Sequence, residues 1–205
     1  MYQEAITSEA KRILDKLRCF PEFYLAGGTA LALQLGHRIS VDFDFFWKKN
    51  IPRNLLSEAE KVFKHLKIEA VVNDSQQLTV AIQGINLTFC RYPFPVISNC
   101  IEYQGIQILP SREIAAMKAY VLGRRATLKD YVDLYFVLKG KIDTLPGIIA
   151  LCEQKYGKEF NTRLFLEQLV YLEDVERVEV QFLQEKVSIQ KLETFFQEEV
   201  QKINI

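Results

Sequence analysis

Two aspartates two residues apart are the part of this 205-residue chain whose chemistry is clearest. Asp42 and Asp44 lie in a run of aromatic and branched residues that predicts a strand over residues 41–47, so both carboxylates project from one face. Two carboxylates on one face of an apolar strand repel each other and lose hydration, which is costly unless a cation lies between them. The pair therefore indicates a site for a divalent metal ion.

A pair of glycines precedes these aspartates. Gly27 and Gly28 follow an apolar run at residues 23–26 that predicts a short buried strand, and they come before a helix predicted over residues 29–35. The N–H groups at the start of that helix lie where a phosphate could bind. Either motif alone is common in turns and at sheet edges. Their combination, about a dozen residues apart, indicates a nucleotide and metal site.

A second group of charged side chains lies further along the chain. It comprises Lys118, Arg124, Arg125, Lys129, Asp130 and Asp133. Basic side chains of this kind can neutralise phosphate oxygens in nucleotidyl transfer, where most catalysis is electrostatic and positional. The alternative is a salt-bridged helix surface, with Arg125 bound to Asp130 or Lys129 bound to Asp133. The functional interpretation requires this cluster to face the two aspartates of the predicted strand.

The composition narrows the class of protein. The 26 basic residues balance 26 acidic ones, which excludes a protein that binds nucleic acid through overall charge. Four dispersed cysteines and two histidines disfavour a zinc site and leave no credible hydrolase triad. The N-terminus has no signal-peptide pattern, and no apolar run approaches ~18 residues, so we expect a cytoplasmic protein without a membrane span.

The hydrophobic pattern predicts a sheet followed by helices, which is an α+β order. Amphipathic helices are expected over residues 6–19 and 53–66. An antiparallel meander is expected over residues 68–72, 78–82 and 85–92, followed by a hairpin or edge strand at 103–109. Helices are expected over residues 111–122, 128–139, 145–154, 162–171 and 188–202. We therefore expect a core over residues 1–109 and a helical portion over 110–205 that packs on the core and completes the site.

Several of these motifs occur together, and in the same order, in one known family. They span residues 27–33, 36–46, 91–95 and 116–118, and Arg125 with residues 129–135. The chain thereby resembles the AbiEii/AbiGii-type nucleotidyltransferase toxins of abortive-infection, type IV toxin–antitoxin systems, over most of its length. The resemblance implies a minimal polymerase-β-like nucleotidyltransferase fold, in which a mixed sheet flanked by helices is followed by a helical C-terminal portion.

The resemblance also implies a reaction and a site. A nucleoside monophosphate would pass from an NTP to an RNA acceptor, often the 3′ end of tRNA, and a cognate antitoxin would be a partner. The metal ligands would be Asp42 and Asp44, which would hold Mg²⁺. The nucleotide-binding residues would be Gly27, Gly28, Thr29, Arg38, Ser40, Lys118 and Arg125. The catalytic residues would be Asp42, Asp44, Lys118, Asp130 and Asp133, with Asp130 or Asp133 orienting the basic side chains or assisting the acceptor hydroxyl.

One position departs from the family pattern. Many relatives have a third aspartate two residues before the position of Cys90, and this chain has Thr88 there. A threonine hydroxyl is a poor Mg²⁺ ligand and cannot act as a general base near neutral pH. Either Glu102, Asp130 or Asp133 takes that place, or transfer is slow or lost. The alternative function is therefore a catalytically weakened nucleotide- or protein-binding module on the same fold.

Overall fold

The computed structural model describes the chain except at positions 123, 125–126 and 204–205. The expected helix break at Gly123 and the candidate residue Arg125 lie outside the described residues. The chain forms two compact units, Met1–Pro110 and Ser111–Ile205. No helix in the described part of either unit is long and apolar enough to cross a membrane.

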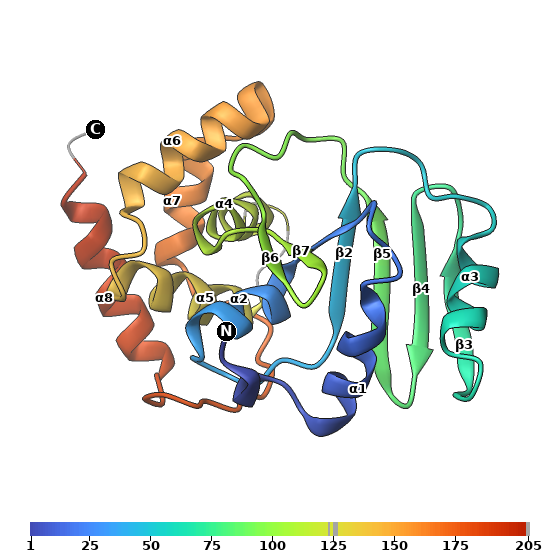
Figure 1. The fold of residues 1–205 in the computed structure, drawn as a ribbon. Coiled ribbons are helices and arrows are strands. Elements are labelled where there is room, and N and C mark those ends of the chain that lie inside the picture. Colours follow the sequence, from blue (N-terminus) through green and yellow to red (C-terminus); the bar gives the residue numbers. More distant parts are fainter. Residues whose placement is uncertain (123, 125–126, 204–205) are drawn as a thin grey trace. The chain divides into compact units, whose positions relative to one another are not determined.

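The first unit is built on a seven-stranded mixed sheet in the order β3-β4-β5-β2-β1-β7-β6 (Figure 1). The strands are β1 (Tyr24–Ala26), β2 (Phe43–Trp47), β3 (Ile68–Asn73), β4 (Gln77–Ile82), β5 (Ile85–Arg91), β6 (Ile101–Tyr103) and β7 (Ile106–Ile108). The predicted meander is confirmed as β3, β4 and β5, and the predicted hairpin as β6 and β7. β2 runs parallel to β5 and antiparallel to β1, so the strand with the aspartate motif lies near the centre of the sheet.

One face of the central strands is apolar because their side chains alternate. Phe45 on β2 and Phe89 on β5 are fully buried, and their rings are 5.6 Å apart. Phe89 also meets the rings of Phe20 and Phe23, each at 4.9 Å, in the segment that follows α1 (Ser8–Leu17). The intervening residues, among them Asp44, therefore project from the opposite face of the sheet.

Two amphipathic helices of the first unit lie beside each other. These are α1 and α3 (Leu55–Val62), and the Lys16 ammonium of α1 donates a hydrogen bond of 3.3 Å to the backbone carbonyl of Val62. Each buries one apolar stripe, and α3 packs on β3. The Thr7 side chain caps α1 by accepting a hydrogen bond from the backbone N–H of Ala10.

The helix between β1 and β2 is buried on nearly all sides. This helix, α2 (Gly27–Leu35), begins at the first glycine of the pair, two residues earlier than predicted. Its Ala and Leu side chains from position 30 to 33 are fully buried. It ends at Gly36, whose φ of +61° makes it a left-handed C-cap.

The described residues of the second unit are mainly helical, with a long non-helical segment over residues 171–188 between its last two helices. It contains α4 (Ser111–Leu122), α5 (Leu128–Lys139), α6 (Leu145–Tyr156), α7 (Thr162–Val170), α8 (Ile189–Gln201) and the short 3₁₀ helix η2 (Gly157–Glu159). α4 packs against α5, α6 and α7, and α8 packs against α5 and α7. Because α5 is covered on several sides, Asp130 and Asp133 are buried within the unit.

Candidate active site

The start of α2 lies directly against the Asp44 carboxylate. Ala26 and Asp44 are partners in the β1–β2 ladder, and Gly27 follows with a φ of +71°. A Cβ atom at Gly27 would be 2.6 Å from Asp44 Oδ2, so any side chain would displace the carboxylate. The N-cap residue is Ala26, which provides no side-chain hydrogen bond to the first N–H groups of the helix. The glycine is therefore required for the helix terminus and the carboxylate to come this close.

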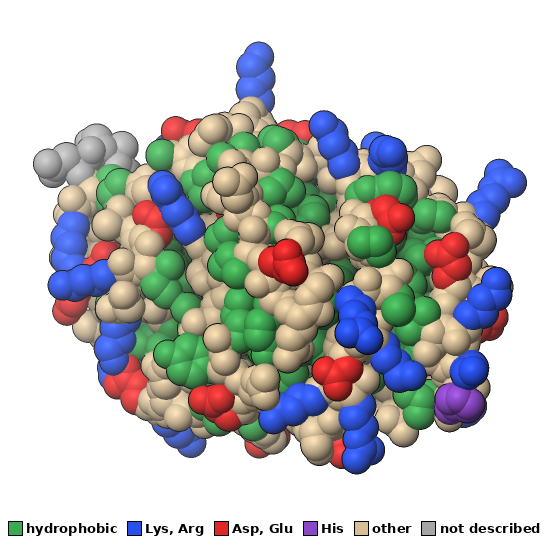
Figure 2. Space-filling view, in the orientation of Figure 1, with side chains coloured by type: hydrophobic (Ala, Val, Ile, Leu, Met, Phe, Trp, Pro, Cys, Tyr) green, Lys and Arg blue, Asp and Glu red, His purple; other side chains and the backbone are tan. Residues whose placement is uncertain are grey.

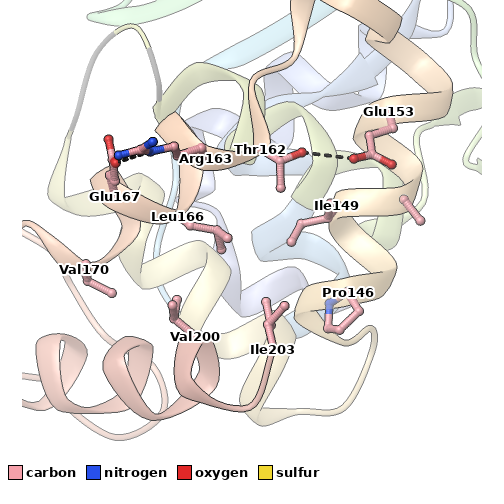
Figure 3. Close-up of a pocket in the computed structure, with 11 residues that line it drawn as sticks. Pro146, Ile149, Glu153, Thr162, Arg163, Leu166, Glu167, Val170, Val200 and Ile203 are labelled. Carbon is pink, nitrogen blue, oxygen red and sulfur yellow. Dashed lines mark hydrogen bonds and ion pairs between the residues drawn. The ribbon is translucent and has the colours of Figure 1, made fainter. Parts of the chain in front are cut away.

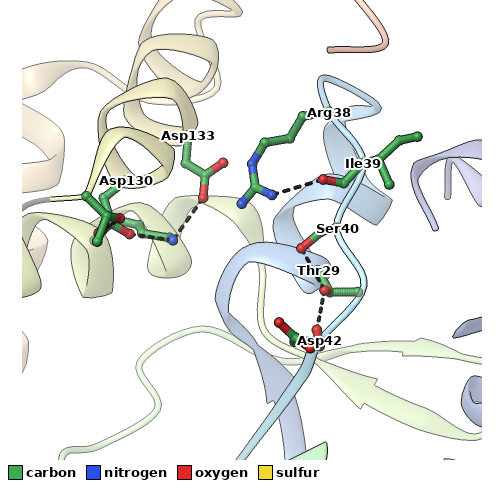
Figure 4. Close-up of polar contacts among 9 residues, drawn as sticks. Thr29, Arg38, Ile39, Ser40, Asp42, Asp130 and Asp133 are labelled. Atoms are coloured by element: carbon green, nitrogen blue, oxygen red, sulfur yellow. Dashed lines mark hydrogen bonds and ion pairs between the residues drawn. The ribbon is translucent and has the colours of Figure 1, made fainter. Parts of the chain in front are cut away.

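Asp42 lies one residue before β2, whereas the sequence pattern predicted it inside the strand. Its Oδ1 atom accepts a hydrogen bond of 2.9 Å from the backbone N–H of Asn86, at the start of β5. Its backbone carbonyl accepts a hydrogen bond from the hydroxyl of Thr29, which also lies 2.9 Å from Ser40 Oγ (Figure 4). Asp42 is thus fixed by both α2 and β5.

A buried guanidinium lies next to the first turn of α2. Arg38 is 2% exposed, and its Nη1 atom donates a hydrogen bond of 3.2 Å to the Ile39 carbonyl. A Cβ atom at Gly28 would be 2.5 Å from Arg38 Nη2 and 3.4 Å from Ser40 Oγ. Because Gly28 has no side chain, there is room for the guanidinium beside it. This place is also the N-terminal, positive end of the α2 dipole, where an anion binds favourably.

The two aspartates suit a magnesium–nucleotide complex. Carboxylate oxygens are the ligands that Mg²⁺ prefers in proteins, and it commonly takes one or two of them together with phosphate oxygens and water. Among the described residues, no group of three or more His, Cys, Asp or Glu is placed to hold a metal ion. Asp42 and Asp44 therefore fit a metal that arrives with a nucleotide better than one held by protein ligands alone.

Thr88 occupies the place beside Asp44 on the next strand. The two residues are partners in the parallel β2–β5 ladder, so their side chains share a face. The Thr88 hydroxyl lies 3.2 Å from the hydroxyl of Thr79, its partner on β4. Glu102 is on β6, three strands away from β2, which is about 14 Å at the usual strand spacing. Glu102 is therefore too far away to replace a third carboxylate.

Cys90 follows Thr88 on the same face of β5. Burial, and then the charges of Asp44 and Asp74, raise the pKa of the Cys90 thiol to about 11. The thiol is therefore protonated at neutral pH and is neither a nucleophile nor a metal ligand there.

In the second unit, Lys118 binds both predicted aspartates. Its Nζ atom is 2.7 Å from Asp130 Oδ1 and 2.9 Å from Asp133 Oδ2 (Figure 4). The Lys118 side chain is 13% exposed, and those of Asp130 and Asp133 are 5% and 0% exposed. Of the two salt bridges considered from the sequence, the one between Lys129 and Asp133 is not observed among the described residues, where Lys129 is exposed. The one between Arg125 and Asp130 involves a residue outside the described part of the chain. Two buried carboxylates thus hold one ammonium group in place.

Thr127 is a member of this cluster that the sequence interpretation missed. Its hydroxyl donates a hydrogen bond of 2.7 Å to Asp130 Oδ2, the carboxylate oxygen that does not bind Lys118. The available signal was the spacing of a threonine three residues before an acidic residue at a helix start.

A cavity of about 750 Å³ in the second unit holds none of the predicted site residues (Figure 3). It lies among α6, α7 and α8, and its walls are mainly aliphatic, including Ile149, Leu166 and Val200. Two of its polar side chains, Arg163 and Glu167, bind each other at 2.8 Å. The cavity therefore lacks the convergent donors that a phosphate group requires.

The seven-stranded mixed sheet of the first unit and the helices of the second unit give the chain the polymerase-β-like fold of solved nucleotidyltransferases. A Helicobacter pylori protein solved as a candidate nucleotidyltransferase matches 98% of this chain and 97% of its own, with a TM-score of 0.62 and 21% identity. The nucleotidyltransferase toxin MenT4 of Mycobacterium tuberculosis matches 96% of this chain and 84% of its own, with a TM-score of 0.61 and 14% identity. These similarities establish the fold.

Sequence comparison identifies the family. An uncharacterized protein of Aquifex aeolicus (strain VF5) is 32% identical over 174 residues, which are 82% of this chain and 84% of the relative. The model of the nucleotidyl transferase AbiEii toxin of type IV toxin–antitoxin systems matches residues 11–203. The chain belongs to this AbiEii toxin family, which confirms the resemblance inferred from its motifs.

Proposed function

We propose that this chain is a metal-dependent toxin enzyme that transfers a nucleoside monophosphate from an NTP to RNA. The observation that carries the proposal is the close approach of the start of α2 to the Asp44 carboxylate. A Cβ atom at Gly27 would lie only 2.6 Å from Asp44 Oδ2, so only glycine allows this approach. A phosphate-binding helix terminus beside metal-binding carboxylates is the arrangement that a magnesium–triphosphate complex requires.

The triphosphate would bind at the first turn of α2. The backbone N–H groups of Gly27 and Gly28 would donate hydrogen bonds to phosphate oxygens, because the N-cap side chain does not use them. Arg38 and Ser40 lie beside the second glycine and would add a positive charge and a hydroxyl. Thr29 would hold this segment in place through its contacts with Ser40 and the Asp42 carbonyl.

Asp42 and Asp44 would hold the magnesium ion. When bound, Mg²⁺ neutralises charge that develops on the attacking and leaving oxygens. The hydrogen bond from Asn86 keeps Oδ1 of Asp42 at the strand end, and the neighbouring backbone keeps Asp44 against α2. Both carboxylates would thus be oriented before the nucleotide arrives, which lowers the cost of positioning it.

Lys118 would contact the phosphates or stabilise the transition state. Its two carboxylate partners outweigh its single positive charge and restrict its motion, so its main contribution is an oriented hydrogen-bond donor. Asp130 and Asp133 would act mainly by orienting Lys118, and Arg125 would add a second cation.

The acceptor would be RNA, with the 3′ end of tRNA as the first candidate, and a cognate antitoxin would restrain the activity. Membership of the AbiEii toxin family supports both parts of this statement. The reaction itself would release pyrophosphate as the acceptor hydroxyl attacks the α-phosphate of the NTP.

A labelling assay tests the proposed activity. Purified chain is incubated with Mg²⁺, bulk tRNA and each α-³²P-labelled NTP in turn, and we expect label in RNA with at least one NTP. Lys118→Arg should keep the buried charge but misplace the donor, so labelling should fall by about 100-fold. Lys158→Arg changes an exposed lysine in the same unit and should have no effect. Absence of label with every NTP, from protein shown to be folded, contradicts the proposal.

The position of Thr88 favours a second candidate, a nucleotide-binding module with weak or no transfer. Thr88 faces the same side as Asp44, where it provides a hydroxyl in place of a carboxylate. This module would bind NTP in a thermal-shift assay without turning it over.

Thr88→Asp distinguishes the two candidates. If the missing carboxylate limits transfer, the variant should label RNA at least tenfold faster than the natural chain, because a third oxygen ligand would join the site. Asn73→Asp is the control, since it adds a carboxylate at an exposed position of β3, away from the proposed site. Normal transfer by the natural chain with no gain in Thr88→Asp would show that two carboxylates suffice.

A further inference from the structure

The segment from Lys48 to Lys67 carries an excess of positive charge that the candidate active site does not use. Its basic residues are Lys48, Lys49, Arg53, Lys61, Lys64 and Lys67. All six side chains are exposed, and the segment contains two acidic residues, Glu58 and Glu60. Because the whole chain has a formal net charge of zero, this basic surface is a local concentration of charge.

The fold gathers these side chains along one margin of the first unit. Lys48 and Lys49 follow β2 directly, Lys61 lies on α3, and Lys64 and Lys67 lie between α3 and β3. The inward stripe of α3 is apolar and buried, so its charged residues point away from the sheet. Figure 2 shows several Lys and Arg side chains over α3, with some acidic side chains among them.

Little within the chain balances these charges. In the part of the chain that the structure describes, one of the six forms an ion pair, Lys67 with Glu69 at 3.3 Å. Both partners are strongly exposed, at 84% and 69%, so this pair contributes little stability. The Lys49 ammonium lies 5.3 Å from the centre of the Trp47 ring. Unbalanced like charges repel one another, and an extended anion would remove that repulsion.

The basic surface begins close to the carboxylates. Lys48 lies four residues after Asp44, just beyond the end of β2. At the usual rise of a strand, the two residues are about 13 Å apart. A stacked nucleic-acid strand covers that distance in about four nucleotides. An RNA whose 3′ end reaches Asp44 would therefore pass Lys48 and Lys49 at the end of β2 within a few nucleotides. To continue along α3 it would turn around that end of the sheet, because α1 and α3 lie on the face opposite Asp44.

We propose that the basic surface binds the phosphate backbone of the acceptor RNA, an inference that rests on the proposed nucleotidyl transfer. Five of the six cations are lysines, which act as point charges and lack the planar fork with which arginine grips one carboxylate. A spaced row of point charges suits a polyanion with regular phosphates and gives binding that is independent of base sequence.

The test measures RNA binding in the absence of NTP. The triple variant Lys49→Glu, Lys61→Glu, Lys64→Glu is compared with Arg177→Glu, Lys158→Glu, Lys186→Glu, which reverses three exposed charges in the second unit. The probe is fluorescein-labelled tRNA, and its binding is followed by fluorescence anisotropy at NaCl concentrations from about 0.05 to about 0.3 M. We expect the first variant to bind tRNA at least tenfold more weakly than the natural chain. The slope of its plot of log Kd against log[salt] should fall by about 2. The control should change less than twofold.

Three outcomes overturn the inference. They are unchanged tRNA binding in the first variant, an equal loss in both variants, and binding of polyglutamate at least as tight as that of tRNA, which indicates an acidic protein partner instead. The binding assay contains no NTP, so its result does not depend on nucleotidyl transfer. A chain that binds tRNA through this surface but labels no RNA would therefore support this inference and contradict the proposed function. In an active enzyme, the first variant should raise KM for tRNA and leave KM for NTP unchanged.

Discussion

Asp44→Asn is expected to lower the rate of nucleotidyl transfer by about a thousandfold while the protein stays folded. The substitution keeps the shape of the side chain but removes the negative charge beside the first turn of α2. An amide oxygen is a weaker ligand for Mg²⁺ than a carboxylate oxygen, so the metal–triphosphate complex would bind poorly. The measurement is labelling of tRNA with the preferred NTP at saturating Mg²⁺.

The two aspartates should differ in what they do for folding. The Asp42 carboxylate accepts a hydrogen bond from the Asn86 backbone, so Asp42→Ala should cost about 1 kcal/mol of unfolding free energy in addition to activity. Glu198→Gln, an exposed change on α8, is the control and should leave transfer unaltered. Retention of more than a tenth of the natural activity by folded Asp44→Asn would contradict the assignment of Asp44 as a metal ligand.

Local patterns were sufficient to predict much of the first unit. The alternation of Phe43, Asp44 and Phe45 predicts one apolar and one polar face, and β2 has those faces. The hydrophobic pattern over residues 68–72, 78–82 and 85–92 likewise predicted the meander that β3, β4 and β5 form. Such features depend on the period of the chain itself, so the sequence records them directly.

Boundaries depended on interactions that the sequence does not record. The α2 helix begins at Gly27 because the chain turns there, with a positive φ, against Asp44. Asp42 lies outside the strand, where Thr29 and Asn86 hold it. Both differences arise at residues whose hydrogen-bond partners are distant along the chain, and periodicity carries no information about such partners.

The contacts of Lys118 show the same limit. The sequence suggested a pair of Lys129 with Asp133, near neighbours on one helix, whereas the suggested pair of Arg125 with Asp130 involves a residue outside the described part of the chain. The observed partners of Lys118 lie on a different helix, α5, and bring two carboxylates to one ammonium. Strand order decided another alternative, since it places Glu102 three strands from Asp44. Thr88, in contrast, lies beside Asp44 in the register of the sheet.

A buried ion pair in the second unit gives the largest expected effect on stability. The Lys155 ammonium of α6 lies 2.6 Å from Glu113 Oε1 of α4, and both side chains are 0% exposed. Glu113→Ala would leave a buried ammonium without this partner, so we expect a loss of about 3–5 kcal/mol in the free energy of unfolding. The measurement is urea denaturation followed by circular dichroism, with the natural chain as reference.

A double substitution separates the value of the pair from the cost of breaking it. Glu113→Leu with Lys155→Met removes both charges and keeps an apolar contact between α4 and α6, so it should recover most of the stability that Glu113→Ala loses. The exposed pair Arg163 and Glu167, with side chains 88% and 58% exposed, is the control, and Glu167→Ala should give no measurable change. If the double variant were as unstable as Glu113→Ala, the pair itself would be a net source of stability, because removing the stranded charge would then have restored nothing.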